Sequence, residues 1–386
     1  MTDRIKRMKK AFEEAKLPIC PEKIQIFWDT YQKYGNCRPV VWRSKYQAAL
    51  LNKISIFIED DDLICGNGAS KPNGLETDYE YGIWTRDELE MLLGDDQIFT
   101  VTPEDLEIIV DIMQKITDDE RIESTVTYTG KIVGDDPRLW PFMHAGVTLP
   151  PWKDKVRGSG GGNASSGLCI GPGAGLLCVD YDKIIKEGAR SIIDEAKECL
   201  ANNRYYEEDS VEKKEYWEGL IDVYEAWINY AKRHAELAEK MAAECNDEKR
   251  KAELLEMARI CRKCPEHGAE TFREALQIFW FTFLMLVPFS TASPGRFDQY
   301  MYPYYKADIE AGRITDEEVL ELLEIIRIKC MKLNGVSGSS QRKRLSGNAK
   351  WYNMAIGGVK RDGSDATNEL SYLVLDAAAD TLLPHN

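Results

Sequence analysis

The sequence has no excess of positive charge, few cysteines and no long apolar run. Its 386 residues include 50 Lys and Arg against 65 Asp and Glu, which gives a net charge of −15. Affinity for nucleic acid comes largely from clustered positive charge, so nucleic acid is not an expected partner. The most apolar stretch, Ile278 to Phe289, has about a dozen residues, whereas a membrane span needs about twenty. A membrane is not an expected partner either.

Cysteine is too sparse for a disulfide framework. The ten cysteines are irregularly spaced along the 386 residues, whereas small secreted domains are dense in cysteine. The first residues, Met1 to Arg7, are charged and lack the apolar core of a secretory signal. These features favour a reducing, cytoplasmic setting.

Several catalytic and ligand-binding motifs are also missing. The sequence has no Walker loop, no G-x-S-x-G and no H-E-x-x-H, and the glycine-rich run from Arg157 to Gly175 is typical of a loop rather than of a nucleotide cradle. Cys261, Cys264 and His267 form a C-x-x-C-x-x-H string. On one helix these side chains would point apart, and no fourth ligand follows at zinc-finger spacing. We therefore expect no metal site.

Most of the chain shows helical periodicity, and strands are expected at a few places. Thr85 and Thr102, each followed by acidic residues, predict helix starts. A buried strand at 351–358, a glycine turn at 361–364 and a helix at 368–380 form a strand–turn–helix unit, which indicates an α/β fold. Another strand is expected at 63–67, and further helices at 42–52, most of 181–265, 271–289, from 299 onward and 315–333.

The string from Ser293 to Tyr305, SPGRFDQYMYPYY, closely resembles a signature of the glycyl radical enzymes. This family includes pyruvate formate-lyase, glycerol and diol dehydratases, choline lyase and arylacetate decarboxylases. Further segments resemble the family pattern in the same order along the chain, and together they span most of it: Arg43, 62–67, 271–277, 353–358, 362–363 and 368–371.

The resemblance implies a ten-stranded α/β barrel made of two five-stranded half-barrels and surrounded by helices. Because family members are much longer than this chain, residues 1–386 correspond to the N-terminal portion of one pyruvate formate-lyase-like domain. Within it we expect a glycine-rich loop at 158–175, long helices at 181–265 and the start of the half-barrel at 271–386.

The resemblance also implies a radical mechanism whose two central residues do not occur in this sequence. In the family, a glycyl radical in an Arg-Val-x-Gly-Tyr loop passes to a cysteine in a Gly-Cys loop, and the thiyl removes a hydrogen atom from the substrate. None of the ten cysteines here follows a glycine, and no Arg-Val-x-Gly-Tyr string occurs. We therefore expect no catalytic residue and no bound cofactor in this chain, which should be inactive alone. The family radical is installed by a radical S-adenosylmethionine activating enzyme, which is an implied partner.

Three residues are candidates for contact with a small-molecule substrate. Ser290 and Thr291 precede the signature, where hydroxyl side chains of related dehydratases and decarboxylases face the pocket; alternatively, they cap the preceding helix. His144 is flanked by aromatic residues and is either a core or loop histidine or a pocket residue. Arg296 and Asp298 are expected to form a structural ion pair rather than to bind substrate.

The predicted function is that of the N-terminal part of a glycyl radical lyase of anaerobic metabolism. The loop at 158–163 resembles arylacetate decarboxylases and the signature resembles dehydratases, so cleavage of a C–C or a C–O bond stays open. The expected partner is either a complementing C-terminal half or further copies of this chain in a homo-oligomer. The alternatives are a non-catalytic fragment or scaffold that binds a family partner and, less favoured, a metal-binding helical protein. A half-barrel should expose a strand edge near Met354 and an apolar face.

Overall fold

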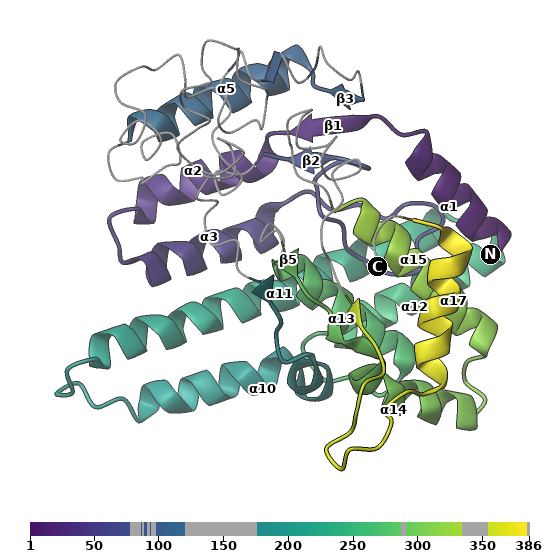
Figure 1. The fold of residues 1–386 in the computed structure, drawn as a ribbon. Helices are drawn as coiled ribbons and strands as arrows, with labels where there is room; N and C mark the ends of the chain where they lie inside the picture. Colours follow the sequence, from purple (N-terminus) through teal and green to yellow (C-terminus); the bar gives the residue numbers. More distant parts are fainter. Residues whose placement is uncertain are drawn as a thin grey trace, which may run out of the picture.

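The computed structural model describes residues 1–77, 86, 89–90, 93, 98–119, 176–286, 291–333 and 354–383. Long helices make up most of this part of the chain, and small parallel sheets lie among them (Figure 1). Four features predicted from the sequence lie outside the described residues: the helix start at Thr85, His144, the glycine-rich loop 158–175 and Ser290.

The N-terminal region packs helices beside a parallel sheet. β1 (Leu17–Cys20) is the middle strand, between β2 (Leu75–Glu76) and β3 (Phe99–Thr100). Parallel strands need long connections, and the connection from β1 to β2 contains α2 (Glu22–Tyr34) and α3 (Pro39–Lys53). α5 (Pro103–Asp118) follows β3, and the three helices lie together in the upper left of Figure 1.

Aromatic side chains of α2 and α3 fill the centre of this region. The Phe27 ring stacks on Tyr31 with centroids 5.5 Å apart, and it meets Trp42 and Tyr46 edge to face at 6.2 and 5.3 Å. Such pairs stabilise a core beyond the area that they bury. Thr102 caps α5, since its hydroxyl accepts a backbone N–H of the first turn. This confirms the helix start predicted there.

The main body is built from long helices in the middle of the chain. α11 packs against α10, α12 and α3 and so joins the body to the N-terminal region (Figure 1). α13 is buried along nearly its whole length, which confirms the buried helix predicted at 271–289. The helices are α10 (Tyr181–Ala201), α11 (Ser210–Glu244), α12 (Glu248–Lys263) and α13 (Phe272–Leu286).

α10 is kinked at Gly188, where φ is 77°. The chain after α12 enters this kink, and the N–H of Ala189 donates to the carbonyl of Pro265 at 2.8 Å. A Cβ on residue 188 would lie 2.6 Å from the carbonyl carbon of His267. The contact therefore requires glycine, because other residues rarely adopt positive φ and their Cβ would clash.

The segment predicted as a strand at 63–67 is irregular, so that prediction was wrong. Side chains of α13 bind its peptide groups instead of a neighbouring strand. Gln277 accepts the N–H of Cys65 at 2.8 Å and donates to the carbonyl of Cys65 at 2.9 Å. The indole N–H of Trp280 donates to the carbonyl of Gly66 at 3.0 Å. Because these side chains satisfy the buried backbone groups, the segment needs no partner strand.

The remaining helices form a group at the right of Figure 1, where α15 packs against both α1 and α17. Capping boxes at Thr315 and Asn368 begin α15 and α17, which confirms the helices predicted at 315–333 and 368–380. The helices of this group are α1 (Asp3–Glu13), α14 (Phe297–Glu310), α15 (Asp316–Met331) and α17 (Glu369–Thr381).

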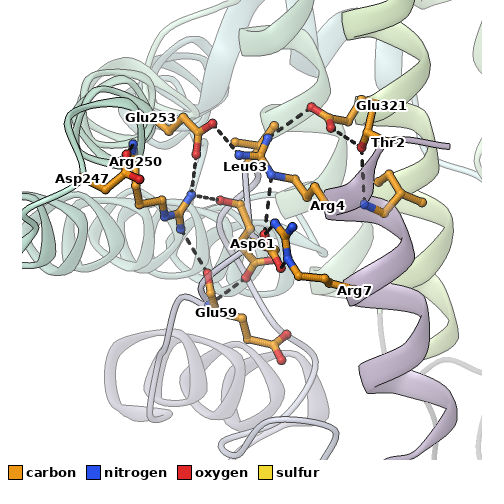
Figure 2. A network of polar contacts seen from close by, with 12 residues as sticks. Thr2, Arg4, Arg7, Glu59, Asp61, Leu63, Asp247, Arg250, Glu253 and Glu321 are labelled. Atoms are coloured by element: carbon orange, nitrogen blue, oxygen red, sulfur yellow. Dashed lines mark hydrogen bonds and ion pairs between the residues drawn. The ribbon is translucent and has the colours of Figure 1, made fainter.

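A polar network fastens α1 to the body (Figure 2). The guanidinium of Arg4 lies between two carboxylates: it donates to Glu321 at 3.1 Å, and it binds Glu253 of α12. It also lies 3.9 Å from Asp61, which accepts a hydrogen bond from Arg7 at 3.0 Å. One arginine of α1 thus joins α12, α15 and the segment that precedes Cys65.

Two pairs of short parallel strands lie in the second half of the chain. β4 (Leu176–Leu177) pairs with β5 (Thr291–Ala292), and β6 (Gly295–Arg296) pairs with β7 (Met354–Ala355). The strand predicted as buried at 351–358 is thus short within the described residues, and Ala355 is exposed. The reason is that β7 has a partner strand on one edge only in the part of the chain that the structure describes.

Candidate functional site

The signature segment begins where the two strand pairs approach each other. Gly295 has φ 63°, and a Cβ on it would lie 2.8 Å from the sulfur of Cys178, just past the end of β4. The N–H of Gly295 donates to the Ser293 hydroxyl at 3.1 Å, and the Tyr300 hydroxyl donates to the carbonyl of Pro294 at 2.7 Å. Glycine at 295 therefore permits a close approach that a larger residue would block.

Arg296 and Asp298 both bind the peptide groups of Gly357, and they do not pair with each other as the sequence predicted. The Arg296 guanidinium donates to the carbonyls of Gly357 at 2.6 Å and Val359 at 3.2 Å. The Asp298 carboxylate, fully buried, accepts the N–H of Gly357 at 2.7 Å and the hydroxyl of Ser371. The predicted ion pair is wrong because each charge is compensated by backbone groups and a hydroxyl.

The turn that follows β7 is held by hydrogen bonds to the same signature segment. Gly357 and Gly358 have φ of 64° and 84°, and a Cβ on Gly358 would lie 3.4 Å from the Arg296 guanidinium. The Gln299 amide donates to the carbonyl of Ala366 at 2.9 Å, and the Asn368 amide donates to that of Asp298 at 3.2 Å. The signature therefore fixes β7, the turn after it and the start of α17 as one unit.

Two adjoining cavities lie near the C-terminal end of α13. Both are open to solvent, and they share Asn67 and Gly68 in their walls. Leu284 and Met285 line the larger one. Thr291 of β5 follows α13 along the chain. The larger cavity therefore lies at the end of α13 from which the chain continues to the predicted substrate contacts.

Charged groups in the cavity walls have partners of opposite charge or backbone hydrogen-bond donors. The lysines that line the smaller cavity each pair with a carboxylate: Lys71 with Asp105, Lys329 with Asp62 and Lys332 with Glu59. In the larger cavity the buried Glu76 accepts the backbone N–H groups of Lys23 and Ser70 at 3.0 and 2.6 Å. Burial raises the pKa of Glu76 above its usual range. In the part of the chain that the structure describes, the three lysines of the smaller cavity are therefore already paired with carboxylates.

Of the predicted substrate contacts, the structure places only Thr291. It opens β5, opposite Leu176 of β4; His144 and Ser290 lie outside the described residues. The cysteines of the C-x-x-C-x-x-H string are buried while His267 is exposed. Within the described ranges no three His, Cys, Asp or Glu side chains converge as metal ligands. Among the helices that the structure describes, none has both the length and the apolarity of a membrane span.

Sequence reasoning missed the cavities and the burial of three side chains, Cys65, Cys261 and His234. All three side chains are at most 1% exposed. They come from the segment before the smaller cavity, from α12 and from α11, so no local spacing connects them. The only signal was the apolar context of Cys65, which was interpreted as a strand.

Comparison with known proteins agrees with this architecture. Residues 1–385 match the family model described as Pyruvate formate lyase-like. An isethionate sulfite-lyase of Oleidesulfovibrio alaskensis is 31% identical over 394 residues, covering 97% of this chain and 44% of that protein. A (2S)-3-sulfopropanediol dehydratase of Klebsiella oxytoca is 27% identical over 394 residues, covering 98% and 44%. The chain thus spans less than half the length of these curated relatives.

A solved structure shows the same fold. The glycerol-bound form of the B12-independent glycerol dehydratase from Clostridium butyricum superposes with a TM-score of 0.84 at 29% identity, covering all of this chain and 47% of that one. The helices and short parallel strand pairs described above are accordingly part of an α/β barrel of this type. The chain belongs to the pyruvate formate lyase-like family of glycyl radical enzymes.

Proposed function

We propose that this chain is the N-terminal part of a glycyl radical lyase that cleaves a C–C or C–O bond of a small organic substrate, as a decarboxylase or a dehydratase does. The observation that carries the proposal is the junction at Gly357, where Arg296 and Asp298 of the signature hold two parallel strands and α17 together. One of the relatives is named a sulfite-lyase, so release of sulfite joins the reactions to be tested.

We place the substrate contacts at Ser290, Thr291 and His144. Support comes from the position of Thr291, at the start of a barrel strand and just after the helix whose end lines the larger cavity. Hydroxyl groups both donate and accept hydrogen bonds, and an imidazole exchanges a proton near neutral pH. Such groups suit a substrate that carries a hydroxyl, carboxylate or sulfonate.

The chain alone is proposed to be inactive. The glycyl radical of the complete family supplies hydrogen-atom abstraction through a cysteine, and neither the Gly-Cys nor the Arg-Val-x-Gly-Tyr string occurs in this sequence. No group described here replaces them, and we derive no radical step on these residues. The radical would be installed by a radical S-adenosylmethionine activating enzyme, acting on the complementing part in the anaerobic cytoplasm.

The complementing part would be a C-terminal half that covers β7 and α17. Its support is the exposure of apolar side chains on α17, with Tyr372 62% and Leu375 53% exposed, beside the strand edge at Ala355. Exposed apolar faces next to an open strand edge favour association. In the absence of the complement, the same face would favour a homo-oligomer.

The test is reconstitution under anaerobic conditions. The coding DNA is first read past Asn386, and any frame that encodes the two loops is expressed with this chain and the activating enzyme. We expect a glycyl radical signal in electron paramagnetic resonance, and product from a diol, an arylacetate or isethionate, only when all parts are present. Radical and product from this chain with the activating enzyme alone would contradict the proposal.

Substitutions in the reconstituted complex test the substrate contacts. Ser290→Ala and Thr291→Ala should lower kcat/KM about tenfold each, the loss expected for one hydrogen bond, while the radical yield stays constant. Ser364→Ala, on an exposed turn, is the matched control and should leave both unchanged. A stable complex that forms neither radical nor product would instead favour the scaffold function, for which the exposed face of α17 is the supporting observation.

A further inference from the structure

The proposed reaction makes no use of the smaller cavity, whose wall is rich in ammonium groups. Three lysines from two distant segments of the chain line it: Lys71, Lys329 and Lys332. Among the described residues of this wall, Glu59 is the one acidic side chain. The carboxylates that pair with Lys71 and Lys329 belong to residues outside the wall. The residues that face the cavity therefore carry an excess of positive charge.

The ion pairs leave these lysines with unused hydrogen-bond donors. An ammonium group has three N–H donors, and in the described structure each of the three lysines donates one hydrogen bond. The pairs are Lys71 with Asp105 at 2.7 Å, Lys329 with Asp62 at 2.9 Å, and Lys332 with Glu59. Lys329 is buried, and buried donors are nearly always satisfied. The cavity, which is open to solvent, is the space from which an acceptor can reach them.

The same wall contains an acceptor that lacks a donor. Asn73 lines the cavity, and its enclosed Oδ1 accepts no hydrogen bond in the described structure. Two neighbouring side chains of the wall donate elsewhere: the Asn67 amide to the carbonyl of Phe57 at 2.7 Å, and the Trp280 indole to that of Gly66 at 3.0 Å. A ligand that fits the wall should therefore offer several acceptors to the lysines and one donor to Asn73.

Short-range structure fixes these groups before any ligand binds. Lys71 and Asn73 belong to one turn, in which the N–H of Gly74 donates to the carbonyl of Lys71 at 2.9 Å. Lys329 lies in the last turn of α15, and Lys332 is the cap residue of that helix. Because the wall is built from a closed turn and a helix end, binding costs little reorganisation of the chain.

We infer that the smaller cavity binds a small oxyanion that keeps one O–H group, such as hydrogen phosphate. The oxygens of the anion accept N–H groups of the three lysines, and its O–H donates to Oδ1 of Asn73. Hydrogen bonds between charged groups are stronger than those between neutral groups. A cavity lined by charge of one sign also concentrates ions of the opposite sign. The inference does not depend on the lyase reaction.

The test is isothermal titration calorimetry of the full chain at about pH 8, with the ionic strength held constant by chloride. At this pH inorganic phosphate and sulfate are both mainly dianions, but only phosphate keeps an O–H group. We expect a single phosphate to bind per chain and sulfate to bind about tenfold more weakly, because sulfate leaves Asn73 without a donor. Equal affinities for the two anions, or no binding of phosphate, would overturn the proposal.

Methyl phosphate distinguishes the free ion from the phosphate group of a larger molecule. A phosphate monoester has its second pKa near about 6, so at about pH 8 it has the charge of hydrogen phosphate but no O–H group. Methyl phosphate should therefore bind as weakly as sulfate. Methyl phosphate that bound as tightly as inorganic phosphate would contradict the part given to the O–H group.

Asn73→Gly tests the acceptor, because glycine keeps the φ of 52° at this position. The variant should lower the affinity for phosphate to that for sulfate and leave the affinity for sulfate unchanged. An unchanged preference for phosphate would show that Asn73 does not accept the O–H. The comparison of anions on the native chain decides the question even if a variant fails to fold.

Two lysine variants test the donors. Lys71→Met and Lys332→Met should each weaken the binding of phosphate and sulfate alike, by about tenfold or more, which is the loss expected for a hydrogen bond between charged groups. Lys45→Met is the matched control, since Lys45 also pairs with a carboxylate but lies outside the cavity wall, and it should leave both affinities unchanged. An equal loss in Lys45→Met would show that the anions respond only to net charge, and the site would be refuted.

Discussion

Replacing Lys329 by Met would remove one partner of a buried ion pair that holds the wall of the smaller cavity. The Lys329 ammonium lies 2.9 Å from an Asp62 oxygen, and the two side chains are 3% and 1% exposed. At an effective dielectric constant of about 20, their attraction is about 6 kcal/mol. Desolvation of two charges costs several kcal/mol each, so the intact pair contributes little net stability.

The single substitution is costly for a different reason. Met keeps the apolar stem of the lysine but leaves the Asp62 carboxylate buried without its cation. The second oxygen of Asp62, Oδ2, still accepts the N–H of Glu59 at 3.1 Å. Loss of one member of a buried pair costs about 3–5 kcal/mol. Asp62→Asn in the same chain removes the stranded charge, so the double variant should recover about 2 kcal/mol or more of that loss.

The assay is urea denaturation followed by circular dichroism, with all four members of the cycle compared. Lys45→Met is the matched control, because Lys45 pairs with Asp222 at a similar 2.6 Å but the side chains are 36% and 35% exposed. That control should cost less than about 1 kcal/mol. If Lys329→Met cost no more than Lys45→Met, the argument that burial and not distance decides the cost would be refuted.

Three further substitutions test other parts of the same frame. Burial raises the pKa of Glu324 to about 7. Between about pH 4.5 and 7 the native state therefore binds more protons than the unfolded state, so the free energy of unfolding falls as pH rises through that range. Glu324→Gln should therefore raise stability by up to about 3 kcal/mol at pH 8 and flatten this pH dependence in thermal melts. Arg4→Met should cost about 2–4 kcal/mol by urea denaturation, since it leaves partly buried carboxylates without their cation. Arg7→Met should cost under about 1 kcal/mol, because the Arg7 side chain is 61% exposed. Asp298→Asn should cost about 2–3 kcal/mol and speed hydrogen exchange at Gly357, whose N–H it binds; unchanged exchange would count against the junction described here.

The parts of the fold that could be predicted from the sequence depend on neighbours along the chain. Thr102, Thr315 and Asn368 each cap a helix through a backbone N–H within the first turn, and a cap is a local interaction. The buried helix at 271–289 shows an apolar character all round, which is also a local signal. The family signature is a continuous string, so its resemblance could be recognised without any knowledge of contacts.

The failed predictions depend on groups far apart in the chain. Residues 63–67 look like a strand because apolar residues precede a glycine, but the partner of Cys65 is the side chain of Gln277. Arg296 and Asp298 look like an ion pair because they are opposite charges two residues apart. Each instead binds Gly357, a residue whose positive φ presents its carbonyl and N–H to both. No spacing rule contains that geometry.

The C-x-x-C-x-x-H string shows that a regular spacing does not by itself place side chains in one environment. Residues three apart on a regular helix lie on one face, about 60° apart around the axis, so the spacing alone suggests that Cys261 and Cys264 are neighbours. Cys264 is the cap residue at which α12 ends, and burial leaves it an inert thiol. Cys261 is buried within α12, whereas His267 lies beyond the end of that helix and is exposed. The three residues of the string therefore lie in different surroundings because α12 ends within it, and the spacing of the residues contains no information about that helix end.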